Sequence, residues 1–103
     1  MKARKQLREL LARKTLLIAP GAFDGLSALL VEQAGFEAVY LSGGAVARSA
    51  ALPDLGLMTM SEVTARARQV TAAVALPVIA DADTGYGNAL SVVRTVREFE
   101  HAG

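Results

Sequence analysis

Two aspartates follow a short apolar run in the C-terminal third of the chain. Asp81 and Asp83 stand two residues apart, directly after residues 76–80, which have the pattern of a buried strand. Neighbouring carboxylates repel each other, and burying them is costly unless a cation offsets their charge. Mg²⁺ suits such a site, because it needs few protein ligands and keeps several waters. The pattern indicates a Mg²⁺ site or, equally well, carboxylates that cap a helix or order a turn.

Three other groups of residues are candidates for binding or catalysis. Ser42, Gly43 and Gly44 offer a hydroxyl and several unshielded backbone N–H groups, which suits a small anion, although a plain glycine turn has the same composition. Asp54 is a candidate general acid or base, or a turn residue, since Pro-Asp sequences favour turns. Tyr40 can donate a hydrogen bond to a ligand, or serve only in aromatic packing.

The hydrophobic pattern predicts three short strands that bring these candidates to one place. They are expected over residues 15–19, 38–41 and 76–80, and a loop rich in small residues is expected to follow Gly44 and to run through residue 56. Strands that are apolar throughout are typical of a parallel sheet covered by helices. Because sites in such proteins gather at the carboxyl ends of the strands, the candidates should share one edge of the sheet.

Helices are predicted before the first strand and after each strand. An amphipathic helix with Leu7, Leu10 and Leu11 on one face is expected over residues 2–13. Asp24 is expected to cap a helix that runs to residue 34. The third helix begins at a Thr-x-x-Glu capping box, residues 59–62. The last is expected over residues 89–102, and the apolar side chains that it should turn inward are those of Val92, Val93, Val96 and Phe99.

Composition limits the class of protein further. The chain has 103 residues, 52% of them hydrophobic, with a formal net charge of +1 and no Cys. The apolar content excludes a disordered chain, and the small charge argues against nucleic acid or an anionic membrane surface as a partner. The lack of Cys excludes a disulfide framework or a Cys nucleophile in these residues. Without a signal peptide or a membrane-spanning run, a cytoplasmic protein is expected.

The number of strand–helix units is small for a closed architecture. A (β/α)₈ barrel typically needs about 250 residues, so three units are less than half of one. We therefore expect residues 1–103 to be a partial TIM-like barrel domain, with a short helix before its three N-terminal βα units. The alternative is a small open α/β sheet with an exposed parallel edge strand.

Four segments resemble motifs of the isocitrate lyase/phosphoenolpyruvate mutase superfamily, especially its methylisocitrate lyase and carboxyphosphonoenolpyruvate phosphonomutase-like members. Their order and spacing run through the whole chain, and the Asp-Ala-Asp-Thr-Gly-Tyr-Gly run is the most specific. The four segments are residues 20–24, 40–44, 52–56 and 80–88.

The resemblance implies a TIM-like barrel that is a homo-oligomer in its full-length form. It also implies a Mg²⁺-dependent carbon–carbon lyase that acts on a small 2-hydroxy or 2-oxo carboxylic acid such as 2-methylisocitrate. By the same resemblance, Asp81 and Asp83 hold Mg²⁺, largely through waters, and Asp54 is the catalytic residue that faces the substrate. The residues expected to bind the substrate are Tyr40, Ser42, Gly43 and Gly44.

Lyases of this family carry a catalytic Cys on a later loop, which is not among these 103 residues. We therefore expect the isolated chain to be inactive as a lyase. Two alternatives stay open. One is a phosphonomutase or oxaloacetate decarboxylase of the same superfamily, and the other is a non-catalytic fragment that associates with a complementary chain.

Overall fold

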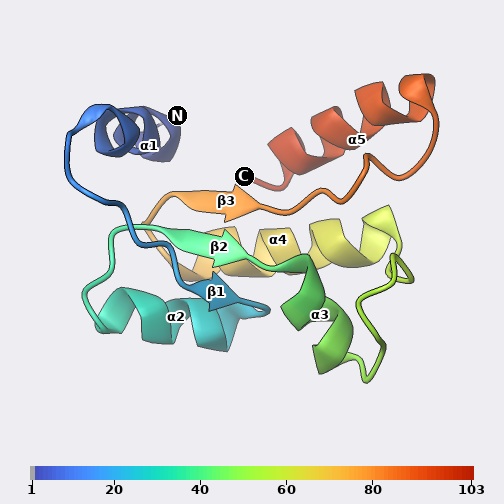
Figure 1. Cartoon of the computed structure of the whole chain (residues 1–103), viewed down its shortest axis with the longest axis horizontal. Coiled ribbons are helices and arrows are strands. Elements are labelled where there is room, and N and C mark those ends of the chain that lie inside the picture. The colour runs from blue at the N-terminus through green and yellow to red at the C-terminus, as the bar shows by residue number, and fades with distance from the viewer. Residues whose placement is uncertain (1) are drawn as a thin grey trace.

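The computed structural model describes residues 2–103 and contains a three-stranded parallel sheet with helices around it (Figure 1). The strands lie in the order β1–β2–β3, and Tyr40 in β2 pairs with Gly21 on one side and Ile79 on the other. This parallel sheet confirms the α/β class, and its three strands end at the same edge. The strand bounds are β1 Gly21–Ala22, β2 Val39–Leu41 and β3 Val78–Ala80.

Two helices, α2 and α4, pack against each other and cover one face of the sheet. In Figure 1, α1 and α5 lie on the far side of β3 from β1. Among residues 2–103, no helix combines the length and apolarity that a membrane crossing requires. The helix bounds are α1 Lys2–Ala12, α2 Gly25–Gln33, α3 Gly43–Ser49, α4 Met60–Ala73 and α5 Ala89–His101.

The core lies between the sheet and the helices that cover it. Val39 and Leu41 are fully buried, while Tyr40 between them is only partly buried. Successive side chains of a strand point to opposite faces, so Tyr40 lies on the face away from this core. The remaining buried members of the core cluster are Ala22, Ala28, Val31, Val46, Val63, Ala67, Val70 and Ala102.

Both predicted helix caps are present. The Asp24 carboxylate accepts a hydrogen bond from the Ser27 N–H at 2.8 Å, and α2 begins at the next residue. Thr59 and Glu62 form the predicted reciprocal capping box at the start of α4. These side chains satisfy N–H groups that the first turn of a helix leaves without a partner.

The strand predicted over residues 15–19 is wrong. Pairing with β2 begins only at Pro20, whose carbonyl accepts from the Tyr40 N–H at 2.9 Å. β2 has only three residues, and its register places Gly21 and Ala22 opposite Tyr40 and Leu41. Residues 15–19 therefore have no partner in β2. The apolar run upstream therefore lies outside the sheet, and Leu16 is 82% exposed.

The loop predicted after Gly44 is also wrong at its start, because α3 extends through Ser49. The Ser42 hydroxyl caps the helix by accepting from the Ala45 N–H at 3.1 Å. Val46 and Ala47 are buried in the core. This burial outweighs the weak helix propensity of Gly43 and Gly44. It depends on tertiary contacts, which the local sequence does not predict.

The terminal helices turn fewer apolar side chains inward than their patterns predicted. In α1 only Leu10 is buried, while Leu11 is 63% exposed. In α5, Val93 and Val96 are each 51% exposed, so the prediction that they face inward is wrong. The buried residue of α5 is Thr95. These helices lie beyond the edge strand β3 rather than across a face of the sheet, and α5 packs mainly against α4.

Candidate functional site

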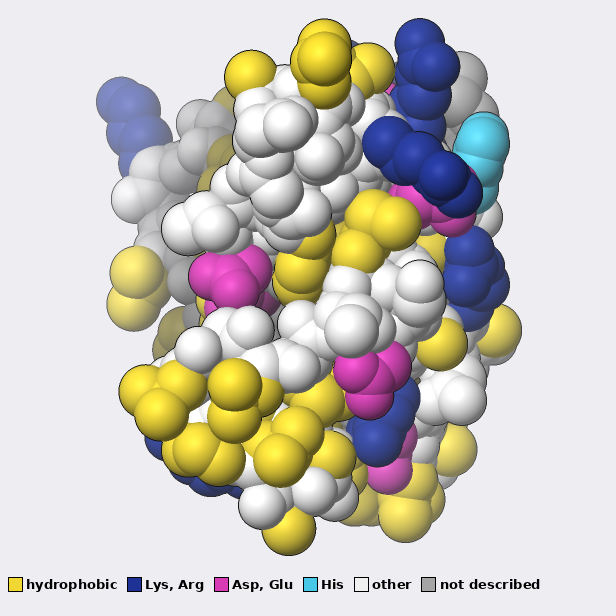
Figure 2. Space-filling model, turned by 90° about the vertical axis from the view of Figure 1, so that its right-hand side faces the viewer, with side chains coloured by type: hydrophobic (Ala, Val, Ile, Leu, Met, Phe, Trp, Pro, Cys, Tyr) yellow, Lys and Arg dark blue, Asp and Glu magenta, His cyan; other side chains and the backbone are white. Residues whose placement is uncertain are grey.

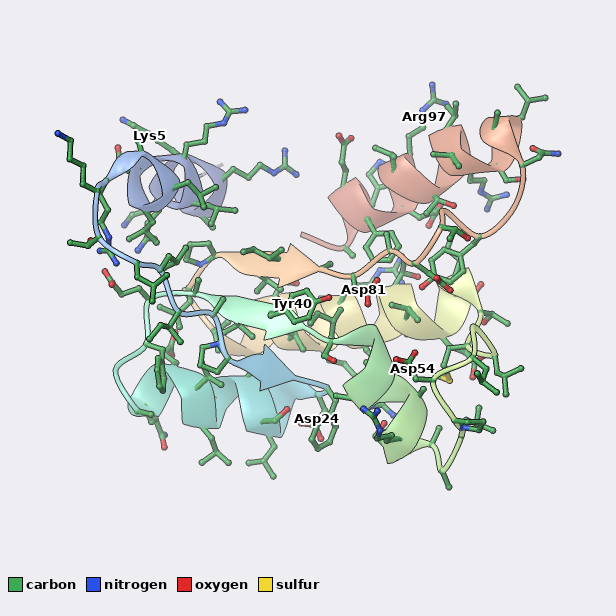
Figure 3. All side chains as sticks on the ribbon, viewed as in Figure 1. Lys5, Asp24, Tyr40, Asp54, Asp81 and Arg97 are labelled. Atoms are coloured by element: carbon green, nitrogen blue, oxygen red, sulfur yellow. The ribbon has the colours of Figure 1, made fainter. Side chains whose placement is uncertain are left out.

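The predicted site residues lie at the edge where the strands end. Figure 3 shows Tyr40 on β2, Asp81 just beyond β3 and Asp54 beyond α3, all toward this edge. Figure 2 views the molecule from this side, where acidic side chains lie among hydrophobic ones. A cavity of about 50 Å³ opens here, and its wall includes Gly43, Asp54, Met58, Asp81, Asp83 and Tyr86. The fold thus brings together residues that are up to 43 positions apart in the sequence.

Asp81 is held by backbone donors from two different segments. Its Oδ2 accepts from the Gly43 N–H, at the start of α3, at 3.3 Å. Its Oδ1 accepts from the Asp83 N–H at 2.8 Å. Since a carboxylate has about four acceptor positions, these two bonds do not exhaust its capacity to bind a ligand. The orientation of Asp81 is therefore fixed before any ligand arrives.

Asp83 is exposed and has an unusual backbone. Its φ of +50° lies in the left-handed region, which Asp tolerates better than most residues. A methyl group on Gly56 would lie 3.4 Å from Asp83 Oδ2, so the loop that carries Asp54 also approaches this second carboxylate. The structure thus places Asp81 and Asp83 on the same cavity, as a shared site requires.

Asp54 approaches the site over Gly44. A Cβ on Gly44 would lie 2.9 Å from Asp54 Oδ2 and 3.0 Å from Arg48 Nη1. The missing side chain at Gly44 therefore makes room for a carboxylate and a guanidinium on the same side of the helix. Asp54 is exposed, which leaves its carboxylate accessible to a ligand.

The N–H groups of the Ser42–Gly44 segment are less free than the sequence indicated. The Gly43 N–H donates to Asp81, and the Ala45 N–H donates to the Ser42 hydroxyl. The Ser42 oxygen therefore acts as an acceptor, and its hydroxyl proton remains to be donated to a ligand. This segment links the end of β2 to the carboxylate at the end of β3.

Two phenols flank the carboxylates. Burial raises the pKa of Tyr40, and the charge of Asp81 together with a hydrogen bond to it raises the pKa further. Burial, together with the charges of Asp83 and Asp81, raises the pKa of Tyr86 to about 12. Both side chains are therefore neutral hydrogen-bond donors at ordinary pH.

The pKa of Tyr86 predicts a dependence of stability on alkaline pH. The folded value of about 12 lies above the ordinary 10, so the folded chain holds this proton more tightly than the unfolded chain. The stabilisation is fully present below about pH 10 and is lost as the pH rises through about 12. In Tyr86→Phe, the free energy of unfolding should therefore fall less steeply above pH 10, as measured by denaturant unfolding. Equal slopes in both proteins would contradict this prediction.

The donor set fits Mg²⁺ rather than a metal that needs a full protein cage. Within residues 2–103, no group of three or more His, Cys, Asp or Glu side chains is arranged to hold a metal ion. Mg²⁺ is commonly held by one or two carboxylates, with waters or substrate oxygens completing its shell. Asp81 and Asp83 supply that number of carboxylates, and Asp81 retains free lone pairs.

Sequence reasoning did not include every residue of the cavity wall. Met58 is one of the residues not singled out there, and Tyr86, which lies in the same run as the aspartates, is another. Its ring does pack, stacking on Phe99 with the centroids 6.4 Å apart. The position of Tyr86 in the run was therefore the only available signal that it borders the site.

Proteins with a parallel α/β sheet commonly bind ligands at the edge where the strands end, and paired aspartates suit a divalent cation. A profile of the phosphoenolpyruvate phosphomutase family matches residues 7–103. The chain belongs to this family, within the PEP mutase/isocitrate lyase superfamily, which confirms the resemblance seen in the motifs.

Named relatives agree with this family. The chain is 50% identical over 104 residues to 2,3-dimethylmalate lyase from Eubacterium barkeri, covering 100% of this chain and 36% of the relative. It is 53% identical over 97 residues to 2-methylisocitrate lyase from Aeropyrum pernix, covering 94% and 32%. The crystal structure of phosphonopyruvate hydrolase in complex with oxalate and Mg²⁺ matches with a TM-score of 0.95 at 39% identity, covering 100% and 36%. The chain thus spans about a third of the length of the curated relatives it matches.

Proposed function

We propose that this chain provides the strand-end site of a Mg²⁺-dependent lyase that cleaves a carbon–carbon bond in a small 2-hydroxy or 2-oxo carboxylic acid such as 2-methylisocitrate. The observation that carries the proposal is the meeting of Asp54, Asp81 and Asp83 with Gly43 on one small cavity. The two lyases among the relatives support the reaction class. The complex of the hydrolase with oxalate and Mg²⁺ supports the ligand chemistry.

Each residue has a role that its environment supports. Asp81, fixed by two backbone N–H groups, and the adjacent Asp83 would hold the metal ion. When bound, Mg²⁺ supplies positive charge that offsets the negative charge developing on the substrate oxygens. The Ser42 hydroxyl would donate a hydrogen bond to the substrate carboxylate, and the Tyr40 phenol, which is engaged with Asp81, would border the substrate. Asp54 would exchange a proton with the substrate, because its exposed carboxylate reaches the same cavity.

The open side of β3 supports the further proposal that these units continue into a barrel. Among residues 2–103, β3 is an edge strand. A groove of about 740 Å³ runs beside it, with Val78 and Ala80 on its wall. We propose that these three units form part of a (β/α)₈ barrel, that the full-length enzyme is a homo-oligomer, and that residues 1–103 alone do not turn over substrate.

A chimera tests this function directly. Residues 1–103 would replace the matching segment of the Aeropyrum pernix 2-methylisocitrate lyase, to which they are 53% identical. The chimera should consume 2-methylisocitrate when Mg²⁺ is present and stop when Mg²⁺ is chelated. A folded chimera that is inactive on 2-methylisocitrate and 2,3-dimethylmalate would refute the lyase proposal.

A second candidate is phosphonate chemistry, which the similarity to phosphonopyruvate hydrolase favours. The carboxylates and the Ser42–Gly44 segment suit either reaction, because both substrates are small 2-oxo or 2-hydroxy acids. Phosphonopyruvate offered to the chimera distinguishes the two. Its consumption in preference to 2-methylisocitrate would favour the hydrolase or mutase alternative.

A further inference from the structure

The turn that carries the two aspartates has a run of unusual backbone conformations. The φ angles of Asp83, Gly85, Tyr86 and Gly87 are +50°, +94°, +59° and +146°. A bulky residue such as Tyr rarely adopts a left-handed conformation, and such conformations persist only where the surroundings hold them. Some part of the fold must therefore hold this turn in place.

Helix α5 contacts the turn at three points. The Gly85 carbonyl is the nearest acceptor of the Thr95 hydroxyl, at 2.7 Å, with the Ser91 carbonyl at 3.1 Å and Met60 Sδ at 3.3 Å, and Thr95 is only 3% exposed. A side chain on Gly85 would meet Val92, because a Cβ there would lie 2.5 Å from Val92 Cγ2. The Phe99 ring stacks on Tyr86 at an interplanar angle of 16°. The turn is therefore held against one face of α5.

We propose that Thr95 is a positioning residue for the carboxylates of Asp81 and Asp83. The connection runs through the backbone, because the Gly85 N–H donates to the carbonyl of Ala82, the residue between the two aspartates, at 3.0 Å. Fixing Gly85 therefore fixes Ala82, and the Asp83 N–H then stays directed at Asp81 Oδ1. The inference rests on the proposed function only in taking these carboxylates as the metal ligands.

The chain offers a matched control for this role. Thr64 on α4 is also a buried threonine, 2% exposed, and its hydroxyl donates to the Met60 carbonyl at 2.9 Å. Its bond stays within its own helix and does not reach the turn. Thr95→Val and Thr64→Val thus remove the same chemical group from similar environments, and only the first severs the link to Gly85. Thr95→Ser keeps the hydroxyl and should behave like the unmodified chain.

The test compares these variants by hydrogen exchange of the Asp83 and Gly85 amides and by calorimetric titration with Mg²⁺. Thr95→Val should speed exchange at both amides by roughly tenfold or more. It should also weaken Mg²⁺ binding roughly tenfold. Thr95→Ser and Thr64→Val should leave both quantities near their values in the unmodified chain.

Several outcomes would overturn the proposal. One is unchanged exchange at Asp83 and Gly85 in Thr95→Val, and another is an equal effect of Thr64→Val. The proposal would also be overturned if neither Thr95→Val nor Thr95→Ala folded while Thr64→Val did. The Thr95 hydroxyl would then be needed for the whole fold and not only for the turn. Absence of Mg²⁺ binding in the unmodified chain would instead count against the proposed function, while the exchange data would still decide the role of Thr95.

Discussion

Asp83→Asn is expected to lower the Mg²⁺ affinity of the chain by about 100-fold. Mutation of a residue that only supports a metal ligand already lowers affinity by up to about 100-fold, so loss of a proposed ligand should reach this value. Asn has nearly the same shape as Asp and tolerates the left-handed backbone found at this position, so the turn should survive. What is lost is one of the two negative charges that offset the cation. Isothermal titration calorimetry with Mg²⁺, with and without oxalate, measures the change.

Asp24→Asn is the matched control for this variant. Asp24 follows β1 at the same edge of the sheet, but its carboxylate is engaged in capping α2. Asn caps a helix about as well as Asp, so this change removes the same charge without removing a proposed ligand. If Asp83→Asn bound Mg²⁺ as tightly as Asp24→Asn does, the assignment of Asp83 to the metal would be wrong.

Gly43→Ala is expected to weaken Mg²⁺ binding by about tenfold or more while leaving the fold intact. A Cβ at Gly43 would lie 2.6 Å from Asp81 Oδ2, too close for both to keep their positions. The carboxylate can turn aside more easily than the backbone can move, so the collision should displace the ligand. Alanine also has a higher helix propensity than glycine at the start of α3, so stability should not fall.

Gly21→Ala controls for the added methyl group. A Cβ at Gly21 would lie 3.7 Å from the Ser42 Cβ, an ordinary contact. This variant should keep both its unfolding midpoint and its Mg²⁺ affinity. Parallel losses of stability and affinity in Gly43→Ala would show that the methyl group damages the fold rather than the position of Asp81.

The parts of this structure that sequence reasoning predicted correctly depend on neighbours in the chain. Asp24 caps α2 because Ser27 is three residues away, and Thr59 caps α4 because Glu62 is equally close. The aspartate pair directly follows β3 because the strand and the aspartates belong to one short stretch of sequence. These interactions form within a single turn, so their residue types are sufficient to predict them.

The errors and omissions depend on contacts between distant residues. Residues 15–19 have a strand-like composition, yet the register of β2 leaves them outside the sheet. Two glycines lie inside α3 because Val46 and Ala47 are buried by other elements. In the sequence, Thr95 is only a polar residue among the apolar residues of a predicted helix. Its hydrogen bond to Gly85 is known only from the structure.

The sequence by itself therefore determined the α/β class, the helix caps and the acidic run after the third strand, since each rests on patterns and bonds among residues close in the chain. Only the tertiary structure decided that Gly43 would orient Asp81, that Asp54 would reach the same cavity over Gly44, and that α5 would hold the aspartate turn. The physical reason is that these contacts join residues from separate elements. Their distances are set by strand register and helix packing, which local composition does not specify.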